Sequence, residues 1–353
     1  MAARGKYMAY VGSYSYNGKT KGITVYDVDV AKGVFKERCE VEVDNSSYVI
    51  PSNDGRTLYS IADEGVVAFR ILENGSLSRL NSANIKGMRG CHLSTDKDDK
   101  YIFVSGFHDG KSTVMRLRKD GGVGEIVTGV FHKGLGSVAE RNFRPHVTCT
   151  RRTPDGKYVM VCDSGLDQVK IYRFGEKEEK LVQVDAIRCD MESAPRCFRF
   201  SSDGKFMYLM YEQKNVIDVF TYQSGERVPV IERIQTIPTA GEKRSNLTAA
   251  CSMRFSTDEN HMFCGNAGDE SVAVYKRDKG TGLLELICCL PISGEYPKDI
   301  AVFPDDRHIA VINHESNSIT FFHVDYEKGL LVMSSKAISC NEPNSCAIVK
   351  VRN

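Results

Sequence analysis

Residues 145–174 read PHVTCTRRTPDGKYVMVCDSGLDQVKIYRF. This segment holds three short apolar runs separated by two polar turns, and the last run alternates, with Val169 and Ile171 among its β-branched residues. Asp155-Gly156 lies in the first turn, and Asp-Gly favours a tight two-residue hairpin because Gly accepts a positive φ and Asp tolerates one. The segment therefore predicts three antiparallel strands and no helix.

The same pattern recurs along the chain. Asp54-Gly55 and Asp203-Gly204 repeat the turn, and Asp98-Asp99, Asp258-Glu259 and Asp305-Asp306 are weaker versions of it. A repeat of about fifty residues with several strands in each copy is typical of propeller blades. Five further copies begin at Ser47, Cys91, Pro195, Cys251 and Pro297.

The two ends of the chain supply one more blade. YMAYVGSYSYNGKTKGITVYDVD, from Tyr7, matches the second and third runs of a repeat, and Asn344–Val351 matches the first run alone. We therefore predict an all-β, seven-bladed β-propeller with four-stranded antiparallel blades, forming a single domain over residues 1–353. The terminal strands share one blade, which removes the open sheet edges that would invite aggregation.

Composition excludes several classes of protein. A net charge of +1 gives no basic stripe of the kind that nucleic-acid binding needs. No apolar run reaches the length of a signal peptide or the ~20 residues of a membrane span. The twelve cysteines form no CxxC pair and no zinc-like spacing. We expect a reduced, cytoplasmic protein that binds neither nucleic acid nor membrane. The sequence does not indicate its oligomeric state.

One stretch carries a resemblance to a known family. Residues 131–172 contain a His-x-Gly-x-Gly loop at His132, then Arg141, Pro145-His146, Pro154-Asp155-Gly156 and an Asp-x-Gly-x-Asp motif at Asp163. The next segment adds Pro195-Arg196 and Glu212. This pattern, which extends from YVGSYS to SCAIVKV, resembles the propeller lactonases, a family that includes 6-phosphogluconolactonases of the propeller type and carboxy-muconate lactonizing enzymes.

The resemblance is incomplete at four positions. Thr148 stands where the family has the second His of Pro-His-x-His, and Cys197 stands where it has the His of Pro-Arg-His. Ala267 replaces an arginine, and Asn142 replaces a glutamine. These departures concern the family's site and not its scaffold.

The resemblance implies a catalytic set of His146, Arg196 and Glu212. A histidine titrates near neutral pH and can move a proton, an arginine can hold an oxyanion or carboxylate, and a glutamate can act as the second acid or base. Arg141 and Arg144 on the preceding loop, and His92 at the start of another first strand, are candidates for substrate binding.

We expect a metal-independent acid/base hydrolase of the carboxylic ester class that needs no cofactor and acts on a small anionic sugar lactone such as 6-phosphogluconolactone. The starts of the first strands include Arg196 and Lys298, and two cations are a poor cage for a divalent ion. Two alternatives remain. One is a cycloisomerase-like lactonizing enzyme that acts on a carboxylate. The other is a non-catalytic propeller that binds a protein on one face.

Overall fold

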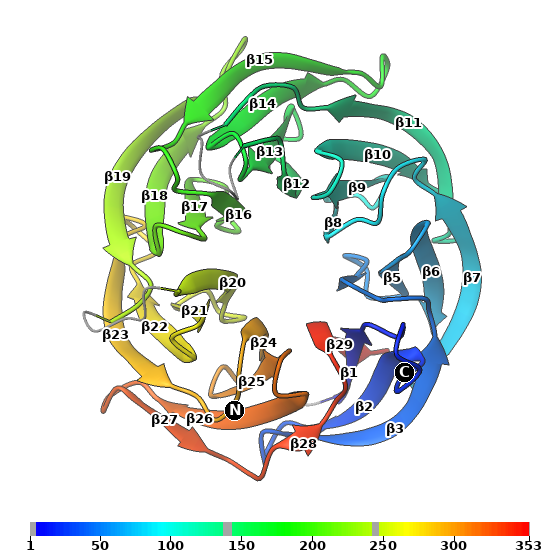
Figure 1. Ribbon diagram of the computed structural model, residues 1–353, viewed down its shortest axis with the longest axis vertical. Helices are drawn as coiled ribbons and strands as arrows, with labels where there is room; N and C mark the ends of the chain where they lie inside the picture. Colours follow the sequence, from blue (N-terminus) through cyan, green and yellow to red (C-terminus); the bar gives the residue numbers. More distant parts are fainter. Residues whose placement is uncertain (1–4, 137–142, 242–246, 353) are drawn as a thin grey trace. The chain divides into compact units, whose positions relative to one another are not determined.

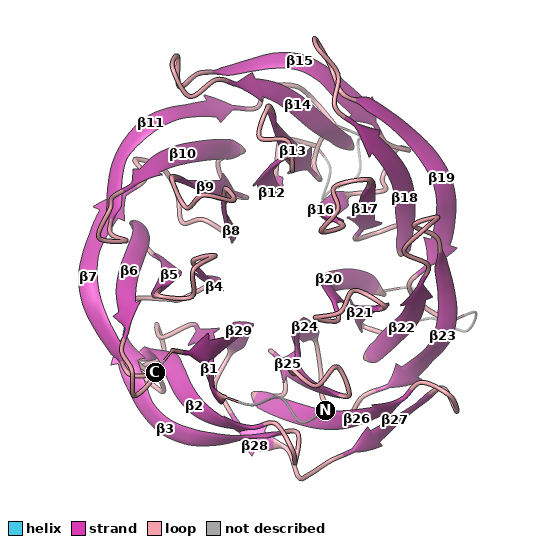
Figure 2. Ribbon diagram, turned by 180° about the vertical axis from the view of Figure 1, so that it is seen from behind, coloured by secondary structure: helices cyan, strands magenta, loops and turns pink. Residues whose placement is uncertain are grey.

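The structure is a computed structural model that describes residues 5–136, 143–241 and 247–352. All regular elements in these ranges are strands, and no helix capable of spanning a bilayer occurs there (Figure 2). The strands form seven antiparallel sheets, which we call blades A to G. The chain falls into two compact units, one of residues 1–51, 71–78 and 237–353 and the other of residues 52–70 and 79–236.

Three blades lie in the first unit. Blade A has the order β29-β1-β2-β3, so its first strand comes from the end of the chain. In blade G, β27 and β28 both pair with β26, so the fourth strand is interrupted. The strands of blade A are β29 (Pro343–Val351), β1 (Lys6–Ser13), β2 (Gly22–Asp29) and β3 (Val34–Glu42); of blade F, β20 (Ala249–Phe255), β21 (His261–Ala267), β22 (Ser271–Arg277) and β23 (Leu284–Pro291); of blade G, β24 (Pro297–Val302), β25 (His308–Asn313), β26 (Ser318–Asp325), β27 (Leu330–Met333) and β28 (Ile338–Ser339).

The other blades follow chain order. Blades C, D and E lie in the second unit, and blade B comprises β4 (Val49–Pro51), β5 (Thr57–Ala62), β6 (Gly65–Ile71) and β7 (Leu77–Asn84). The strands of blade C are β8 (His92–Thr95), β9 (Tyr101–Gly106), β10 (Lys111–Leu117) and β11 (Val123–Phe131); of blade D, β12 (Val147–Arg152), β13 (Tyr158–Asp163), β14 (Gln168–Phe174) and β15 (Leu181–Arg188); of blade E, β16 (Pro195–Phe200), β17 (Phe206–Tyr211), β18 (Val216–Gln223) and β19 (Val230–Pro238).

Blade A joins the two ends of the chain. β29 pairs antiparallel with β1 from Lys6↔Val351 to Ser13↔Pro343, and Figure 1 shows the red end of the chain beside the blue end. This pairing confirms the predicted seven-bladed β-propeller in which the terminal strands share one blade. The core lies between the sheets, where apolar faces of neighbouring blades meet. Phe198 of blade E, for example, is buried in one cluster with Met160 of blade D.

In the six blades other than blade A, the turn between the first two strands differs from the two-residue hairpin that the sequence predicted. In blade D, Thr153 N donates to Tyr158 O at 2.9 Å, so four residues separate the paired positions. The Asp155 carboxylate accepts from Thr153 Oγ1 at 2.5 Å and from Lys157 N at 3.0 Å. Only Gly156 needs the left-handed conformation, with φ of 71°. The hydroxyl–carboxylate bond therefore closes a longer loop than Asp-Gly alone would.

Candidate functional site

The first strands of five blades carry a β-bulge near their starts. In blade D the pairing passes from Val147↔Asp163 to Cys149↔Cys162, and in blade E it passes from Pro195↔Tyr211 to Cys197↔Met210. The skipped residues are Thr148 and Arg196. A bulge leaves its extra residue outside the hydrogen-bond ladder and re-aims the side chain. Thr148 and Arg196, both of which stand at positions of the family pattern, are thus set apart from the sheet by the backbone itself.

Arg196 and Glu212 meet directly. The Arg196 guanidinium donates from Nη1 to Glu212 Oε2, and the two side chains are 24% and 21% exposed. Glu212 directly follows β17, and its N donates to Ala194 O at 2.8 Å. The pair is therefore fixed at one end of blade E and remains accessible to solvent. An arginine held against a carboxylate in this way presents its remaining N–H donors in a fixed direction.

His146 is buried just before β12 and is held by blade C. Its Nδ1 lies 2.8 Å from the carbonyl oxygen of Phe107, and its ring stacks on the Phe107 ring at a centroid distance of 4.2 Å. A carbonyl only accepts hydrogen bonds, so Nδ1 carries the proton and Nε2 keeps its lone pair. This tautomer makes Nε2 the basic atom of the ring.

Asp163 organises the turn beside His146. Its Oδ1 accepts from the backbone N of His146 at 2.9 Å and from those of Gly165 and Leu166 at 3.1 Å. Its Oδ2 lies 2.6 Å from Nδ1 of the buried His132. Burial lowers the pKa of His132, and the hydrogen bond to Asp163 opposes that shift. The quoted motifs contain both residues, but sequence reasoning gave neither a place in the site. In the structure both act as positioning residues, because Asp163 holds the backbone of His146 and His132 holds the Asp163 carboxylate.

Blades C, D and E are linked through these first strands. Thr148 Oγ1 donates to Pro195 O at 3.1 Å, directly before Arg196. Cys91 Sγ donates to Val147 O at 3.4 Å. Burial raises the pKa of the Cys91 thiol to about 12, and the nearby Arg196 charge opposes the shift. The Thr148–Pro195 contact joins the start of β12 to the start of β16, so His146, which directly precedes β12, lies at the same end of its blade as Arg196 does.

The remaining sequence candidates are less central. Arg141 lies outside the described residues. Arg144 is exposed, and its guanidinium carbon lies 5.6 Å from the centroid of the Phe143 ring. His92 is buried on β8, where Arg151 Nη2 approaches its Nε2 at 3.2 Å, and burial lowers its pKa. Sequence reasoning assigned Arg141, Arg144 and His92 to substrate binding, and that role remains a prediction.

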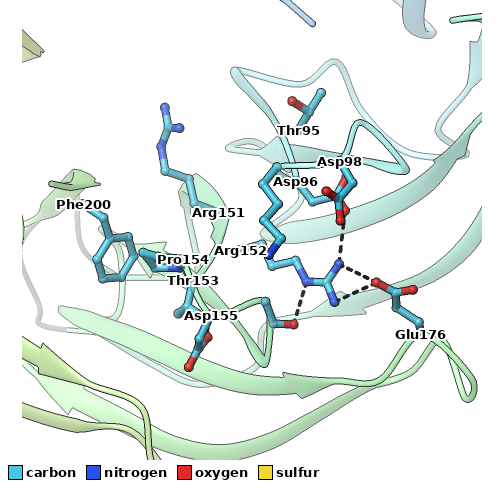
Figure 3. Close-up of a pocket in the computed structure, with 12 residues that line it drawn as sticks. Thr95, Asp96, Asp98, Arg151, Arg152, Thr153, Pro154, Asp155, Glu176 and Phe200 are labelled. Carbon is cyan, nitrogen blue, oxygen red and sulfur yellow. Dashed lines mark hydrogen bonds and ion pairs between the residues drawn. The ribbon is translucent and has the colours of Figure 1, made fainter. Parts of the chain in front are cut away.

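A pocket of about 380 Å³ lies at the opposite end of blades C and D (Figure 3). Arg152 lines it and donates to Asp96 Oδ2 at 3.2 Å and Glu176 Oε1 at 3.4 Å, whereas Arg151 points away from these carboxylates. The pocket thus belongs to the turns and not to the His146 end. Within the described ranges, no group of three or more His, Cys, Asp or Glu side chains could hold a metal ion.

The chain is similar to known proteins along nearly all of its length. The family model described as "Lactonase, 7-bladed beta-propeller" matches residues 8–349. A 6-phosphogluconolactonase of Bacillus subtilis is 27% identical over 346 residues, covering 96% of this chain and 97% of the relative. The crystal structure of a candidate 6-phosphogluconolactonase from Bacteroides fragilis is 28% identical with a TM-score of 0.88, covering 99% of both chains. The periplasmic gluconolactonase of Pseudomonas aeruginosa is 25% identical with a TM-score of 0.90, covering 98% of this chain and 100% of that one. The chain therefore belongs to the family of seven-bladed β-propeller lactonases.

Proposed function

We propose that this protein hydrolyses the lactone of a small anionic sugar, of the 6-phosphogluconolactone type, by acid/base catalysis without a metal ion. The observation that carries the proposal is the Arg196–Glu212 pair. The bulge in β16 sets Arg196 apart from the ladder, and the start of β16 contacts β12, the strand that directly follows His146. The names of the relatives from B. subtilis and P. aeruginosa support a sugar lactone as the substrate class.

In this mechanism Nε2 of His146 takes a proton from water, and the hydroxide oxygen bonds to the lactone carbonyl carbon. The carbonyl oxygen becomes an oxyanion, which the Arg196 guanidinium stabilises. The tetrahedral carbon then expels the ring oxygen, and the imidazolium returns the proton to it. The product is an open-chain hydroxy acid. Glu212 orients Arg196 through their ion pair.

A cytoplasmic location belongs to the same proposal. All twelve cysteines are free thiols, which suits a reducing compartment. The periplasmic relative from P. aeruginosa makes a direct test worthwhile. Fractionation of the native host, with this protein tracked by antibody, should place it in the cytoplasmic fraction, and recovery in any other fraction would overturn the assignment.

The test of function is hydrolysis of freshly generated 6-phosphogluconolactone by the wild type and by His146→Asn, with and without a chelator. An Asn amide nitrogen can replace Nδ1 as donor to Phe107 O but supplies no base at Nε2. We expect chelator-resistant turnover that falls about 10²- to 10⁴-fold in His146→Asn, while the variant still unfolds in one cooperative transition.

Two controls sharpen this test. His323→Asn on β26 removes an imidazole from the other compact unit and should keep full activity. Unphosphorylated gluconolactone as the substrate measures how much the phosphate contributes. No turnover above spontaneous hydrolysis on either lactone would reject the proposed function and favour a binding propeller.

A further inference from the structure

Blade G repeats the bulge of blade E with different chemistry. Its pairing passes from Pro297↔Asn313 to Asp299↔Ile312, so Lys298 is the residue left outside the ladder, as Arg196 is in blade E. Bulges of this kind re-aim a side chain. Lys298 therefore occupies in blade G the position that Arg196 occupies in blade E, and in both blades the bulge residue is a cation.

The partner position also corresponds. His314 N donates to Tyr296 O at 2.9 Å, as Glu212 N donates to Ala194 O at 2.8 Å. Tyr296 and Ala194 are both left-handed, with φ of 58° and 54°. His314 of blade G is thus the equivalent of Glu212, and an imidazole stands where blade E has the carboxylate that pairs with its cation.

Aromatic rings surround the ammonium group of Lys298. Its Nζ lies 4.9 Å from the ring centroid of Tyr14 and 5.8 Å from that of Tyr296, and donates to Asn344 Oδ1 at 2.6 Å. The His314 ring packs edge-on against both tyrosines, at centroid distances of 5.7 and 5.8 Å. We call these five residues the Lys298 cluster.

The Lys298 cluster reaches the surface. Its tyrosines, its lysine and its histidine are all partly exposed. Tyr16 extends the aromatic surface, since the residue is 68% exposed and its ring centroid lies 5.9 Å from that of Tyr14. A left-handed backbone is unusual for a residue as bulky as Tyr296, and such strain concentrates at ligand sites.

The ammonium group of Lys298 is the positive charge of the cluster, and it attracts an anion. Burial, with the neighbouring Lys298 charge, lowers the pKa of His314, so its imidazole is neutral at pH 7. His314 Nδ1 lies 3.1 Å from Pro343 O and therefore donates a hydrogen bond to it. This leaves Nε2 free of a proton, so that it can accept a hydrogen bond from a hydroxyl group. Two of the nearby carboxylates accept hydrogen bonds: Glu270 accepts from Tyr296 N at 2.6 Å, and Glu342 accepts from Asn17 at 3.0 Å. The charges of Glu315 and Glu342 oppose the lowering of the His314 pKa but do not outweigh it.

We propose that the Lys298 cluster is a second binding site, which takes a small sugar that carries a phosphate or carboxylate group. The ammonium group of Lys298 binds the anion, and the tyrosine faces pack against the C–H groups of the sugar. His314 Nε2 accepts a hydrogen bond from a hydroxyl group of the sugar. This site involves none of the proposed catalytic residues, so the inference stands independently of the proposed lactonase activity.

Isothermal titration with glucose 6-phosphate, which has no lactone to hydrolyse, tests the site. An Arg196→Gln background removes the other bulge cation, so the measured heat reports on the Lys298 cluster. We expect Lys298→Gln to weaken binding about tenfold or more, because a charge-assisted hydrogen bond is lost. Lys276→Gln, on the exposed face of β22, is the matched control and should bind as the background does. Equal affinities for Lys298→Gln and Lys276→Gln would overturn the proposal.

Three further measurements decide the class of ligand and guard against misfolding. Tyr16→Ser changes an exposed ring and should fold normally, but we expect it to weaken binding of glucose 6-phosphate severalfold. Gluconate tests a carboxylate in place of the phosphate, and binding that Lys298→Gln weakens would support the same site. Inorganic phosphate should bind more weakly than the sugar phosphate. Equal affinity for both would reject the role of the aromatic rings, and no effect of Tyr16→Ser would exclude Tyr16 from the site.

Discussion

The two ends of the blades differ in how strictly they repeat. At the turn between the first two strands, a hydroxyl donates to a carboxylate two residues later in four blades, at 2.5 to 2.7 Å: Ser52 to Asp54, Thr153 to Asp155, Ser201 to Asp203 and Ser256 to Asp258. At the other end, the bulge residue changes from blade to blade: Thr148, Arg196, Cys251, Lys298 and Asn344.

This difference separates structure from recognition. A device that is repeated in blade after blade stabilises the fold and cannot distinguish one ligand from another. Positions that share a backbone geometry but carry different side chains can build a specific site. The pocket in Figure 3 lies at the repeated end, and its Arg152 is neutralised by Asp96 and Glu176.

The largest effect is expected from removing Asn344–Asn353. This deletion takes away one bulge residue and also nearly all of β29, which pairs with β1 along its length. Blade A would then expose the edge of β1, so we expect loss of the cooperative thermal transition. A truncated chain that melts near the full-length midpoint would show that the shared blade is dispensable.

Glu212→Gln should abolish most activity and leave stability nearly unchanged. The amide keeps the size of the side chain but removes the charge that orients Arg196, so we expect kcat/KM to fall about 10²-fold. Glu125→Gln is the matched control, because Glu125 also pairs with an arginine, Arg116, but on the outer strand β11. Equal activity in the two variants would remove the Arg196–Glu212 pair from the proposed mechanism.

Asp155→Asn should show the opposite behaviour, with reduced stability and unchanged kcat/KM. Asp155 accepts hydrogen bonds from Thr153, Lys157 and Tyr222, and hydrogen bonds to a charged group contribute about 1.5–3 kcal/mol each. We expect urea unfolding to give a loss of about 1–3 kcal/mol. A loss of activity without a loss of stability would place function at the repeated end as well.

The same residue predicts a dependence on pH. Burial alone would raise the pKa of Asp155, but hydrogen bonds from Ser224, Thr153 and other donors outweigh it and hold the pKa below its ordinary value. A depressed pKa adds stability that is present above the unfolded value, about 3.9, and is lost as pH falls through the folded value. The stability difference between wild type and Asp155→Asn should therefore shrink below about pH 4. A constant difference down to pH 2.5 would contradict this linkage.

Cys251→Ser should have the smallest effect. Cys251 is a bulge residue outside the ladder of blade F, and its Sγ donates to Ala249 O at 3.2 Å. A serine hydroxyl can make the same bond, so we expect unfolding free energy to change by about 1 kcal/mol or less. A loss above about 3 kcal/mol would mean that the bulge positions are also structural.

Much of the fold could be predicted from local patterns. Asp-Gly turns, alternating third strands and the split repeat at the two ends led to seven blades and to the pairing of β29 with β1. The turn length was wrong because it was inferred from Asp155 and Gly156 alone. The hydroxyl of Thr153 closes a four-residue loop on the Asp155 carboxylate, and that requires a residue outside the dipeptide.

The site was harder to predict. The family pattern named Arg196 and Glu212, which the structure brings together, and also His146, which is held by Phe107 of another blade. A bulge is a mismatch between two strands, so no property of Arg196 or Lys298 alone indicates that the backbone sets these side chains apart. The grouping of Lys298 with Tyr14 depends on a contact between residues that are 284 positions apart, the difference between 298 and 14.

The pairing of β29 with β1 also has a consequence during synthesis. Met8 pairs with Val349, so the ribosome must add about 340 residues after β1 emerges before its partner exists. At about 5–20 residues per second, the edge of β1 stays open for tens of seconds. Six blades can assemble while the nascent chain grows, but blade A cannot be completed until β29 has been synthesised. The synthesis of β29 therefore decides when the molecule becomes resistant to aggregation and proteolysis.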